Sequence, residues 1–99
     1  MLQTRHILIG GKVQGVGFRS FVFRQARGCG VTGWVRNLQT GQVEVLAQGT
    51  QDVLSIFLNE IKNGPSGSVV SEFVVREVVV QNIFFSFERT EDGSLPNEF

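Results

Sequence analysis

The chain has 99 residues, of which 41% are hydrophobic, and nine Lys and Arg residues balance nine Asp and Glu residues to a formal net charge of zero. This composition predicts one globular domain with one core and excludes an intrinsically disordered chain. One Cys and one His exclude an internal disulfide, a Cys-rich zinc site and a His-pair metal site. No apolar run approaches the ~20 residues of a membrane span, and the first ten residues are too short and mixed for a secretory signal.

The first part of the chain predicts a strand, a loop and a helix. His6–Ile9 has the composition of a strand, and we expect Gly10–Gly11 to end it. Lys12–Gly17 then forms a loop. A helix is predicted from Phe18 onward by one apolar stripe at helical spacing, made of Phe18, Phe21, Val22, Ala26 and Cys29. Gly28 and Gly30 are expected to end this helix.

The middle of the chain predicts a hairpin and a second helix. Val31–Leu38 and Val43–Ala47 show strand alternation on either side of the turn Gln39–Gly41. Thr50 is a suitable N-cap for the helix that follows. The apolar stripe of this helix contains Val53, Ile56, Phe57 and Ile61. Gly64–Pro65 is expected to end the helix.

The last third predicts two strands and a tail. Val69–Val80 reads as a long Val-rich strand and Ile83–Phe87 as a short one, while Glu91–Phe99 is polar and expected to fray. Glu77 falls on the same side of the long strand as its apolar residues, a conflict that the pattern leaves open. Six phenylalanines are expected in the core: Phe18, Phe21, Phe57, Phe73, Phe85 and Phe87.

The element order, β-α-β-β-α-β with an extra short strand, indicates an α+β fold. Such an order places two helices on one face of a mainly antiparallel sheet of four to five strands, the ferredoxin-like βαββαβ sandwich. We expect residues 1–90 to form this domain and residues 91–99 to form a polar C-terminal tail. The fold by itself says little about function, because it supports many chemistries.

The zero net charge conceals an uneven distribution along the chain. Residues 1–49 hold six basic residues and one acidic residue, a net +5, and residues 50–99 hold three basic and eight acidic residues, a net −5. A cationic first half is suited to meeting an anion. A fold that interleaves the two halves cancels the asymmetry, and composition alone favours that second interpretation.

The segment Gly11–Arg19 joins the first strand to the first helix. The first N–H groups of a helix lack internal partners and lie at the positive end of its dipole. Glycines let successive N–H groups turn towards one anion, and the planar guanidinium of Arg19 can hold two oxygens of a phosphate or carboxylate. The spacing matches neither a Walker A loop nor a dinucleotide-binding fingerprint. For a generic connection of this kind, glycines with a purely geometric role are the more common case.

Longer motifs give the segment a more specific meaning. Val13–Arg19, preceded by Gly11-Lys12, resembles the signature of the acylphosphatase family, and Gly33–Asn37 resembles its second motif. The match extends to single glycines and to the end of the second helix: Gly41, Gly49 and Gly64–Pro65. It covers about residues 7–87. Leu38 departs from those members of the family that have Thr at this position.

The resemblance implies an enzyme that hydrolyses small acyl phosphates to a carboxylate and inorganic phosphate, without a metal or cofactor. By position in the motifs, Arg19 is the phosphate-binding arginine and Asn37 the asparagine that orients the attacking water. The phosphate-binding set comprises Gln14, Gly15, Val16, Gly17, Phe18 and Arg19. We expect a cytoplasmic monomer that binds a small-molecule acyl phosphate, releases inorganic phosphate, and has no nucleic-acid or membrane partner.

The residues present suit this reaction. The conjugate acid of a leaving carboxylate has a pKa near ~4, so no general acid is needed at neutral pH, and His6 lies outside both motifs. Phosphoryl transfer has a loose transition state, so the protein mainly positions groups and stabilises charge. Asn37 shares the strand parity of Val35 and must face Arg19. Its amide can hold water but is a poor base, so we expect the proton to pass to a phosphate oxygen of the substrate.

Residues outside the motifs receive structural interpretations. Trp34 is expected to pack on the strand face opposite Asn37, and Cys29 to be a buried small hydrophobe.

Two alternative functions stay open. RNA-binding domains share the βαββαβ order, and Gly17–Phe23 echoes their aromatic motif, although here the stretch is expected on a helix. Acylphosphatase-like domains also begin hydrogenase-maturation carbamoyltransferases, where carbamoyl phosphate is the relevant substrate.

Overall fold

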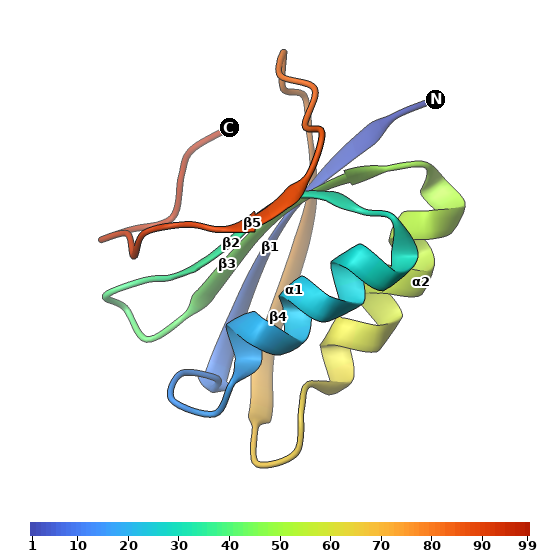
Figure 1. Cartoon of the computed structure of the whole chain (residues 1–99). Helices are drawn as coiled ribbons and strands as arrows, with labels where there is room; N and C mark the ends of the chain where they lie inside the picture. The colour runs from blue at the N-terminus through green and yellow to red at the C-terminus, as the bar shows by residue number, and fades with distance from the viewer.

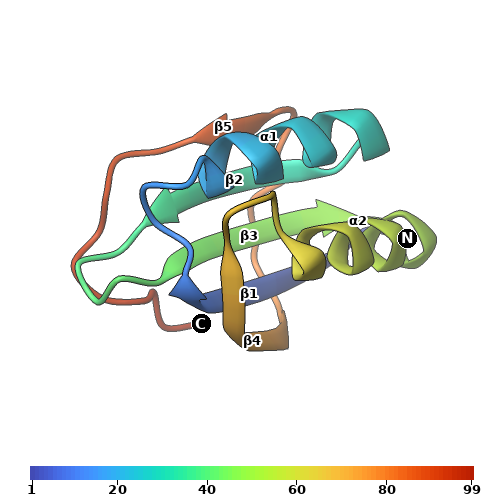
Figure 2. The same cartoon turned by 90° about the horizontal axis from the view of Figure 1, so that it is seen from below.

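The computed structural model describes residues 1–99 as two helices packed on one face of a five-stranded sheet (Figure 1). Its elements are β1 Gln3–Lys12, α1 Phe18–Cys29, β2 Thr32–Asn37, β3 Val43–Gly49, α2 Gln51–Asn63, β4 Val69–Val78 and β5 Phe87–Arg89. The sheet order is β4-β1-β3-β2-β5, with every neighbouring pair antiparallel except β2 and β5, which run parallel. Figure 2 shows α1 and α2 side by side on the sheet. The predicted ferredoxin-like fold is confirmed.

Strand β1 is longer than the glycine pair predicted. The pairing between β1 and β4 shifts register between Gly10 and Gly11, which is a β-bulge, and the strand continues to Lys12. Gly11 has a φ of 118°, and a Cβ there would lie 2.2 Å from the carbonyl oxygen of Val69. The glycines therefore allow a bulge against β4 and do not end the strand.

Both helices end at predicted glycines, although Gly28, which was expected to help end the first helix, lies within α1. Helix α1 is flanked by Gly17 and Gly30, which adopt left-handed conformations with φ of 76° and 78°. At the start of α2, the Thr50 side chain accepts a hydrogen bond from the Val53 N–H at 3.5 Å, and Asp52 lies in the first turn. Gly64 closes α2 by donating its N–H to the Ile61 carbonyl.

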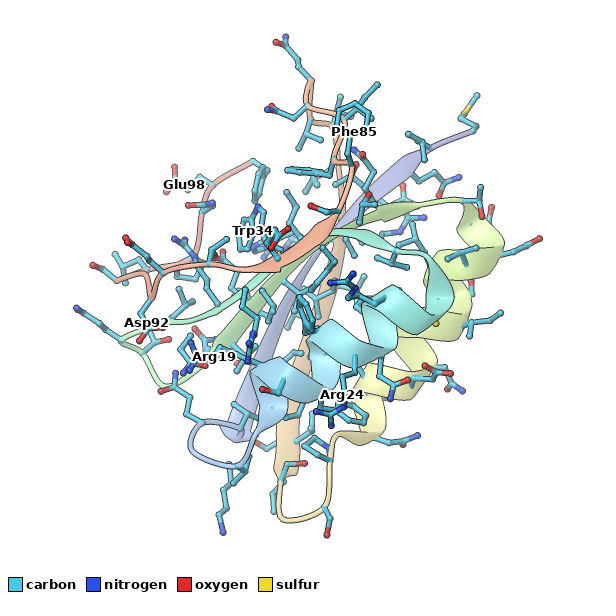
Figure 3. The ribbon with its side chains drawn as sticks, in the orientation of Figure 1. Arg19, Arg24, Trp34, Phe85, Asp92 and Glu98 are labelled. Atoms are coloured by element: carbon cyan, nitrogen blue, oxygen red, sulfur yellow. The ribbon has the colours of Figure 1, made fainter.

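The final strand corrects the predicted boundaries. Strand β4 ends at Val78 instead of Val80, and β5 begins at Phe87, where Ile83–Phe87 was predicted. The Gln48 side chain holds the intervening loop, because its Nε2 donates to the Asn82 carbonyl at 3.0 Å and its Oε1 accepts from the Phe84 N–H at 2.9 Å. Phe85 lies in this loop, away from the helices and 91% exposed (Figure 3), so its assignment to the core was wrong.

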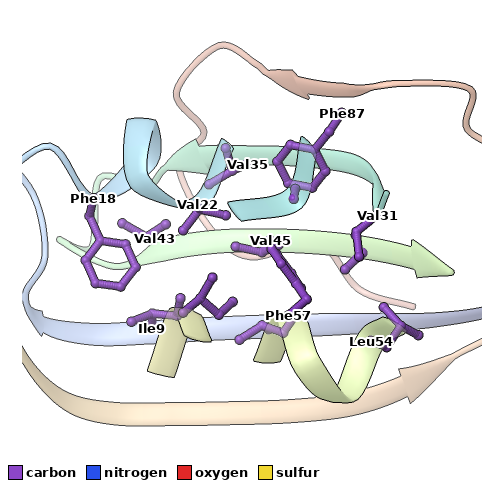
Figure 4. Packing of buried hydrophobic residues seen from close by; sticks show 14 of the residues in the cluster. Ile9, Phe18, Val22, Val31, Val35, Val43, Val45, Leu54, Phe57 and Phe87 are labelled. Carbon is purple, nitrogen blue, oxygen red and sulfur yellow. The ribbon is translucent and has the colours of Figure 1, made fainter. Parts of the chain in front are cut away.

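The core lies between the helices and the inner face of the sheet (Figure 4). Fifteen buried residues form it, including Phe18, Phe57 and Phe87, while Phe21 and Phe73 pack against it partly buried. Strand alternation explains this face, since Ile7 and Ile9 of β1 are both fully buried. Glu77 lies opposite Arg5 in the β1–β4 register, and its carboxylate approaches the guanidinium to 3.4 Å. The conflict at Glu77 is thus resolved by a cross-strand ion pair.

The opposite face of the sheet buries a carboxylate. Glu44 of β3 is fully buried, with Oε1 accepting from Arg36 Nε at 2.7 Å and Oε2 lying 2.7 Å from His6 Nε2. The same Oε2 accepts from the Asn97 backbone N–H at 2.7 Å, and the His6 and Phe99 rings stand 5.1 Å apart. A buried carboxylate needs such donors. The tail is therefore ordered on this face, and the expectation that it frays was wrong.

Candidate active site

The loop between β1 and α1 is shaped by two glycines in left-handed conformations. Gly15 and Gly17 have φ of 73° and 76°, and a Cβ at either position would meet no heavy atom within 4 Å. Backbone conformation, and not crowding, therefore selects glycine at both positions. No side chain caps α1, so its first N–H groups stay available to an external acceptor.

A small cavity opens where this loop meets the end of β2. Its volume is about 120 Å³, and its lining comprises Val13, Gln14, Gly15, Gly17, Phe18, Arg19, Ser20, Asn37 and Arg89. The lining contains two guanidinium groups and no carboxylate, so its electrostatic character favours an anion. Two larger cavities, of about 560 and 610 Å³, lie beside the N-terminal strand and under the tail, and neither touches either motif. The small cavity is the candidate site because it is lined by two arginines and by residues of both motifs, although it is smaller than the other two cavities.

Asn37 reaches this cavity from the end of β2. Its side-chain Oδ1 is buried and has no hydrogen-bond partner in the protein. A buried acceptor left unpaired costs about 1–3 kcal/mol, so such an atom in a cavity marks a place where a water molecule or substrate supplies the missing donor. The structure brings Asn37 and Arg19 together on one lining, as their motif positions led us to expect.

Arg19 lies in the first turn of α1 with its side chain 40% exposed. Its one side-chain hydrogen bond runs from Nη1 to Asp92 Oδ1 at 3.3 Å and connects the helix with the tail; both residues are labelled in Figure 3. Asp92 is itself 65% exposed and does not line the cavity. An exposed ion pair of this kind contributes little stability, and Nε and Nη2 of the Arg19 guanidinium make no hydrogen bond within the protein.

The Gln14 side chain fastens the loop to the β2–β3 hairpin. Its Nε2 donates to the carbonyl oxygens of Leu38 at 2.8 Å and Gln42 at 2.9 Å. The Gln14 side chain therefore binds the hairpin that carries Asn37, which leaves only the backbone N–H of Gln14 for the expected phosphate cradle. Val16 packs its side chain against the core and does not line the cavity.

Arg89 and Ser20 are site residues that sequence reasoning missed. Arg89 Nη1 donates to the Ser20 hydroxyl at 2.9 Å, and the guanidinium carbon stands 5.3 Å from the centre of the Phe23 ring. The predicted last strand ended at Phe87, so Arg89 fell outside it. The signal that could have found it is the continued alternation from Phe87 to Arg89, which places both residues on one side of a strand.

Other reactive side chains lie away from the cavity. Burial raises the pKa of the Cys29 thiol above its usual value, and the neighbouring Glu60 carboxylate raises it further, so the thiol is not activated as a nucleophile. Trp34 stacks on Arg36, whose guanidinium carbon is 5.2 Å from the ring centre, on the face opposite Asn37.

No group of three or more His, Cys, Asp or Glu side chains is arranged to hold a metal ion. Neither helix is long and apolar enough to cross a membrane.

Comparisons with known proteins show which family the chain resembles. The acylphosphatase family model matches residues 5–89, which include both motifs and Arg89. The chain is 44% identical over 79 residues to an acylphosphatase of Bifidobacterium longum, covering 80% of this chain and 81% of that one. It is 47% identical over 75 residues to an acylphosphatase of Chlorobaculum tepidum, covering 76% and 82%.

Solved structures share the fold closely. The crystal structure of acylphosphatase from Bacillus subtilis superposes with a TM-score of 0.84 at 40% identity, covering 91% of this chain and 99% of that chain. Full-length HypF, in a phosphate- and nucleotide-bound form, gives a TM-score of 0.86 at 38% identity over 94% of this chain but 12% of that chain. By sequence and by structure, the chain belongs to the acylphosphatase family of enzymes.

Proposed function

We propose that the chain hydrolyses the carboxyl–phosphate bond of small acyl phosphates in the cavity between the β1–α1 loop and β2. In this proposal Arg19 binds the phosphoryl oxygens and Asn37 orients the attacking water. The observation that carries it is the unpartnered, buried Oδ1 of Asn37 in the same small cavity as the Arg19 guanidinium. One group offers an acceptor to water, and the other offers a cation to the phosphate.

The phosphoryl group is held by backbone donors as well as by Arg19. The proposed cradle comprises the N–H groups of Gln14, Gly15, Val16, Gly17 and Phe18. The left-handed glycines turn this backbone at the positive end of α1, which is the arrangement that binds phosphate at helix N-termini. Donors fixed before the substrate arrives need no reorganisation as charge develops in the transition state.

The reaction needs no base from the protein. The water oxygen forms a bond to phosphorus, the bond from phosphorus to the acyl oxygen breaks, and its electron pair leaves with the carboxylate. A proton of the water passes to a phosphoryl oxygen, so an acyl phosphate dianion and water become a carboxylate and dihydrogen phosphate. The Asn37 amide accepts from the attacking water and aligns it without taking the proton.

The test is steady-state hydrolysis of acetyl, carbamoyl and benzoyl phosphate by the wild type and by Arg19→Ala. We expect phosphate release by the wild type and none above background by Arg19→Ala. Arg24→Ala is the matched control, because Arg24 is exposed on the same helix and does not line the cavity. Full activity of Arg19→Ala would remove the proposal.

The likeness to part of HypF supports a second possibility, that the chain acts as a module of a larger protein with carbamoyl phosphate as its substrate. The expected result for this possibility is a marked preference for carbamoyl over acetyl phosphate in the same assay.

The RNA-binding alternative is disfavoured because Gly17–Phe23 lies at the start of α1, with Phe18 in the core and not on an open strand. We retain as proposals the division into residues 1–90 and 91–99, a cytoplasmic monomer, and the absence of a nucleic-acid partner.

A further inference from the structure

Arg89 is a second cation on the lining of the candidate site. It comes from β5, whereas Arg19 comes from α1, and the two guanidinium groups share one cavity of about 120 Å³. The Ser20 hydroxyl and the Phe23 ring hold Arg89 in place, and both belong to α1. The position of Arg89 is therefore set by the same helix that carries Arg19.

The charge of Arg89 is not neutralised by the protein. Asp92 approaches Arg19 to 3.3 Å, but no carboxylate lies within 4.0 Å of Arg89. Its contacts are a neutral hydroxyl and a ring face, which fix the guanidinium without consuming its charge. Two cations on one small lining repel each other, and an anion bound between them offsets that repulsion.

An acyl phosphate in hydrolysis is an anion that carries negative charge at two ends. Its phosphoryl end is charged throughout, and in a loose transition state the bond to the leaving oxygen is largely broken, so negative charge accumulates on the carboxylate. If Arg19 holds the phosphoryl oxygens, as the proposed function requires, the second cation is available to the leaving group. We infer that Arg89 is a further catalytic residue, which donates to the acyl carboxylate oxygen as the P–O bond breaks and the electron pair moves onto that oxygen.

This role predicts a dependence on the leaving group. A series of substituted benzoyl phosphates varies the basicity of the leaving carboxylate while keeping its shape similar. Arg89→Met should lower kcat/KM by about 10- to 100-fold for the most basic leaving groups. The deficit should shrink as the leaving carboxylate becomes less basic, because a weaker base needs less stabilisation. The plot of log kcat/KM against leaving-group pKa therefore becomes steeper in the variant.

Matched variants separate charge from packing. Arg24→Met removes an exposed arginine from the same helix and should leave the slope unchanged. Arg89→Lys keeps a cation and should recover part of the loss, with a slope nearer the wild type. Ser20→Ala removes only the hydroxyl that holds Arg89 and should steepen the slope less than Arg89→Met. Binding of inorganic phosphate as a competitive inhibitor should be nearly unchanged in Arg89→Met, whereas inhibition by benzoate should weaken.

Two results would overturn the inference. An equal loss for every leaving group would show that Arg89 supports the structure only. A rise in the inhibition constant of inorganic phosphate equal to the loss in kcat/KM would make Arg89 a phosphate ligand instead. Thermal unfolding of each variant identifies a folding defect. If Arg89→Met is defective, the slopes of Arg89→Lys and Ser20→Ala are compared with the wild type instead. Failure of the proposed function is distinguishable, because it appears as unimpaired activity in Arg19→Ala whatever the slope of Arg89→Met.

Discussion

Asn37 and Arg19 reach one cavity with complementary chemistry, an unpaired buried acceptor and a half-exposed cation. Their proposed roles differ, since one group handles water and the other handles phosphate. Variants at the two positions should therefore separate turnover from anion binding.

Asn37→Ala should lower kcat by about 10²–10³, the cost of one aligned polar group in a preorganised site. Inorganic phosphate should still bind as a competitive inhibitor with little change. Arg19→Ala should lose both turnover and phosphate binding, and Arg19→Lys should recover little, because an ammonium cannot make the two-pronged contact of a guanidinium. If Asn37→Ala lost phosphate binding as severely as Arg19→Ala, this division of roles would be wrong.

Glycine conformation decides how strand β2 lies against β3. Gly33 has a φ of 130°, and a Cβ there would stand 1.9 Å from the Leu46 carbonyl oxygen. Gly33→Ala should lower the free energy of unfolding by at least about 2 kcal/mol in urea, because a strained backbone and a main-chain clash combine. Gly28 in α1 meets nothing within 4 Å and has no positive φ, so Gly28→Ala should stabilise the protein by about 0.5–1 kcal/mol. Equal effects of the two variants would contradict this account.

The β1–α1 loop and the β2–β3 hairpin act as one unit through Gln14. Its two hydrogen bonds to backbone carbonyls place the loop against the strand end that carries Asn37. Gln14→Ala should lower the free energy of unfolding by about 1–3 kcal/mol, because two part-buried acceptors lose their donor. We also expect kcat/KM to fall, because the loop is no longer held against the hairpin that carries Asn37. Urea titration and steady-state kinetics on the same preparation check both effects, and unchanged kinetics would show that the loop holds its shape without the contact.

The halves of the chain interleave in three dimensions, which removes most of the charge asymmetry. Strand β1 of the basic half pairs with β4 of the acidic half, and the Arg5–Glu77 and Arg19–Asp92 ion pairs connect the two. At the cavity, Arg89 makes no ion pair, and Arg19 has only the exposed contact with Asp92. A neutral molecule therefore presents a cationic site, which suits a small dianion better than a long polyanion.

The tail joins the two faces of the molecule. It follows the β2–β3 hairpin (Figure 2), where Gly93 and Asn37 share a backbone hydrogen bond, and then donates the Asn97 N–H to buried Glu44. Asn97→Pro deletes this donor and should lower the free energy of unfolding by about 1–3 kcal/mol relative to Asn97→Ala, which keeps it. Chemical unfolding of both variants is the measurement. Equal stabilities would show that the tail contributes nothing to burial of the carboxylate.

Local sequence patterns determined most of the architecture. Caps and glycines define both helices, and strand alternation defines the hairpin, because these features depend on neighbours a few residues away. The stripe predicted for α2 was wrong at Ile56, which is 57% exposed, while Leu54 is buried instead. The same reasoning failed at Phe85 and at the β5 boundary, where Gln48 holds a loop from a distant strand. Long-range hydrogen bonds of this kind leave no periodic trace in the segment they fix.

The two motifs identified Arg19, Asn37 and the glycine loop from the sequence alone, because their spacing along the chain is distinctive. Only the tertiary structure decided that Arg89 joins them and that the tail seals Glu44 on the opposite face. Both depend on where a terminal segment docks, and that is set by a parallel pairing with β2 and by a buried carboxylate in need of donors. Composition excluded metal sites and disulfides built on several His or Cys residues. The fold determined where the remaining charges meet.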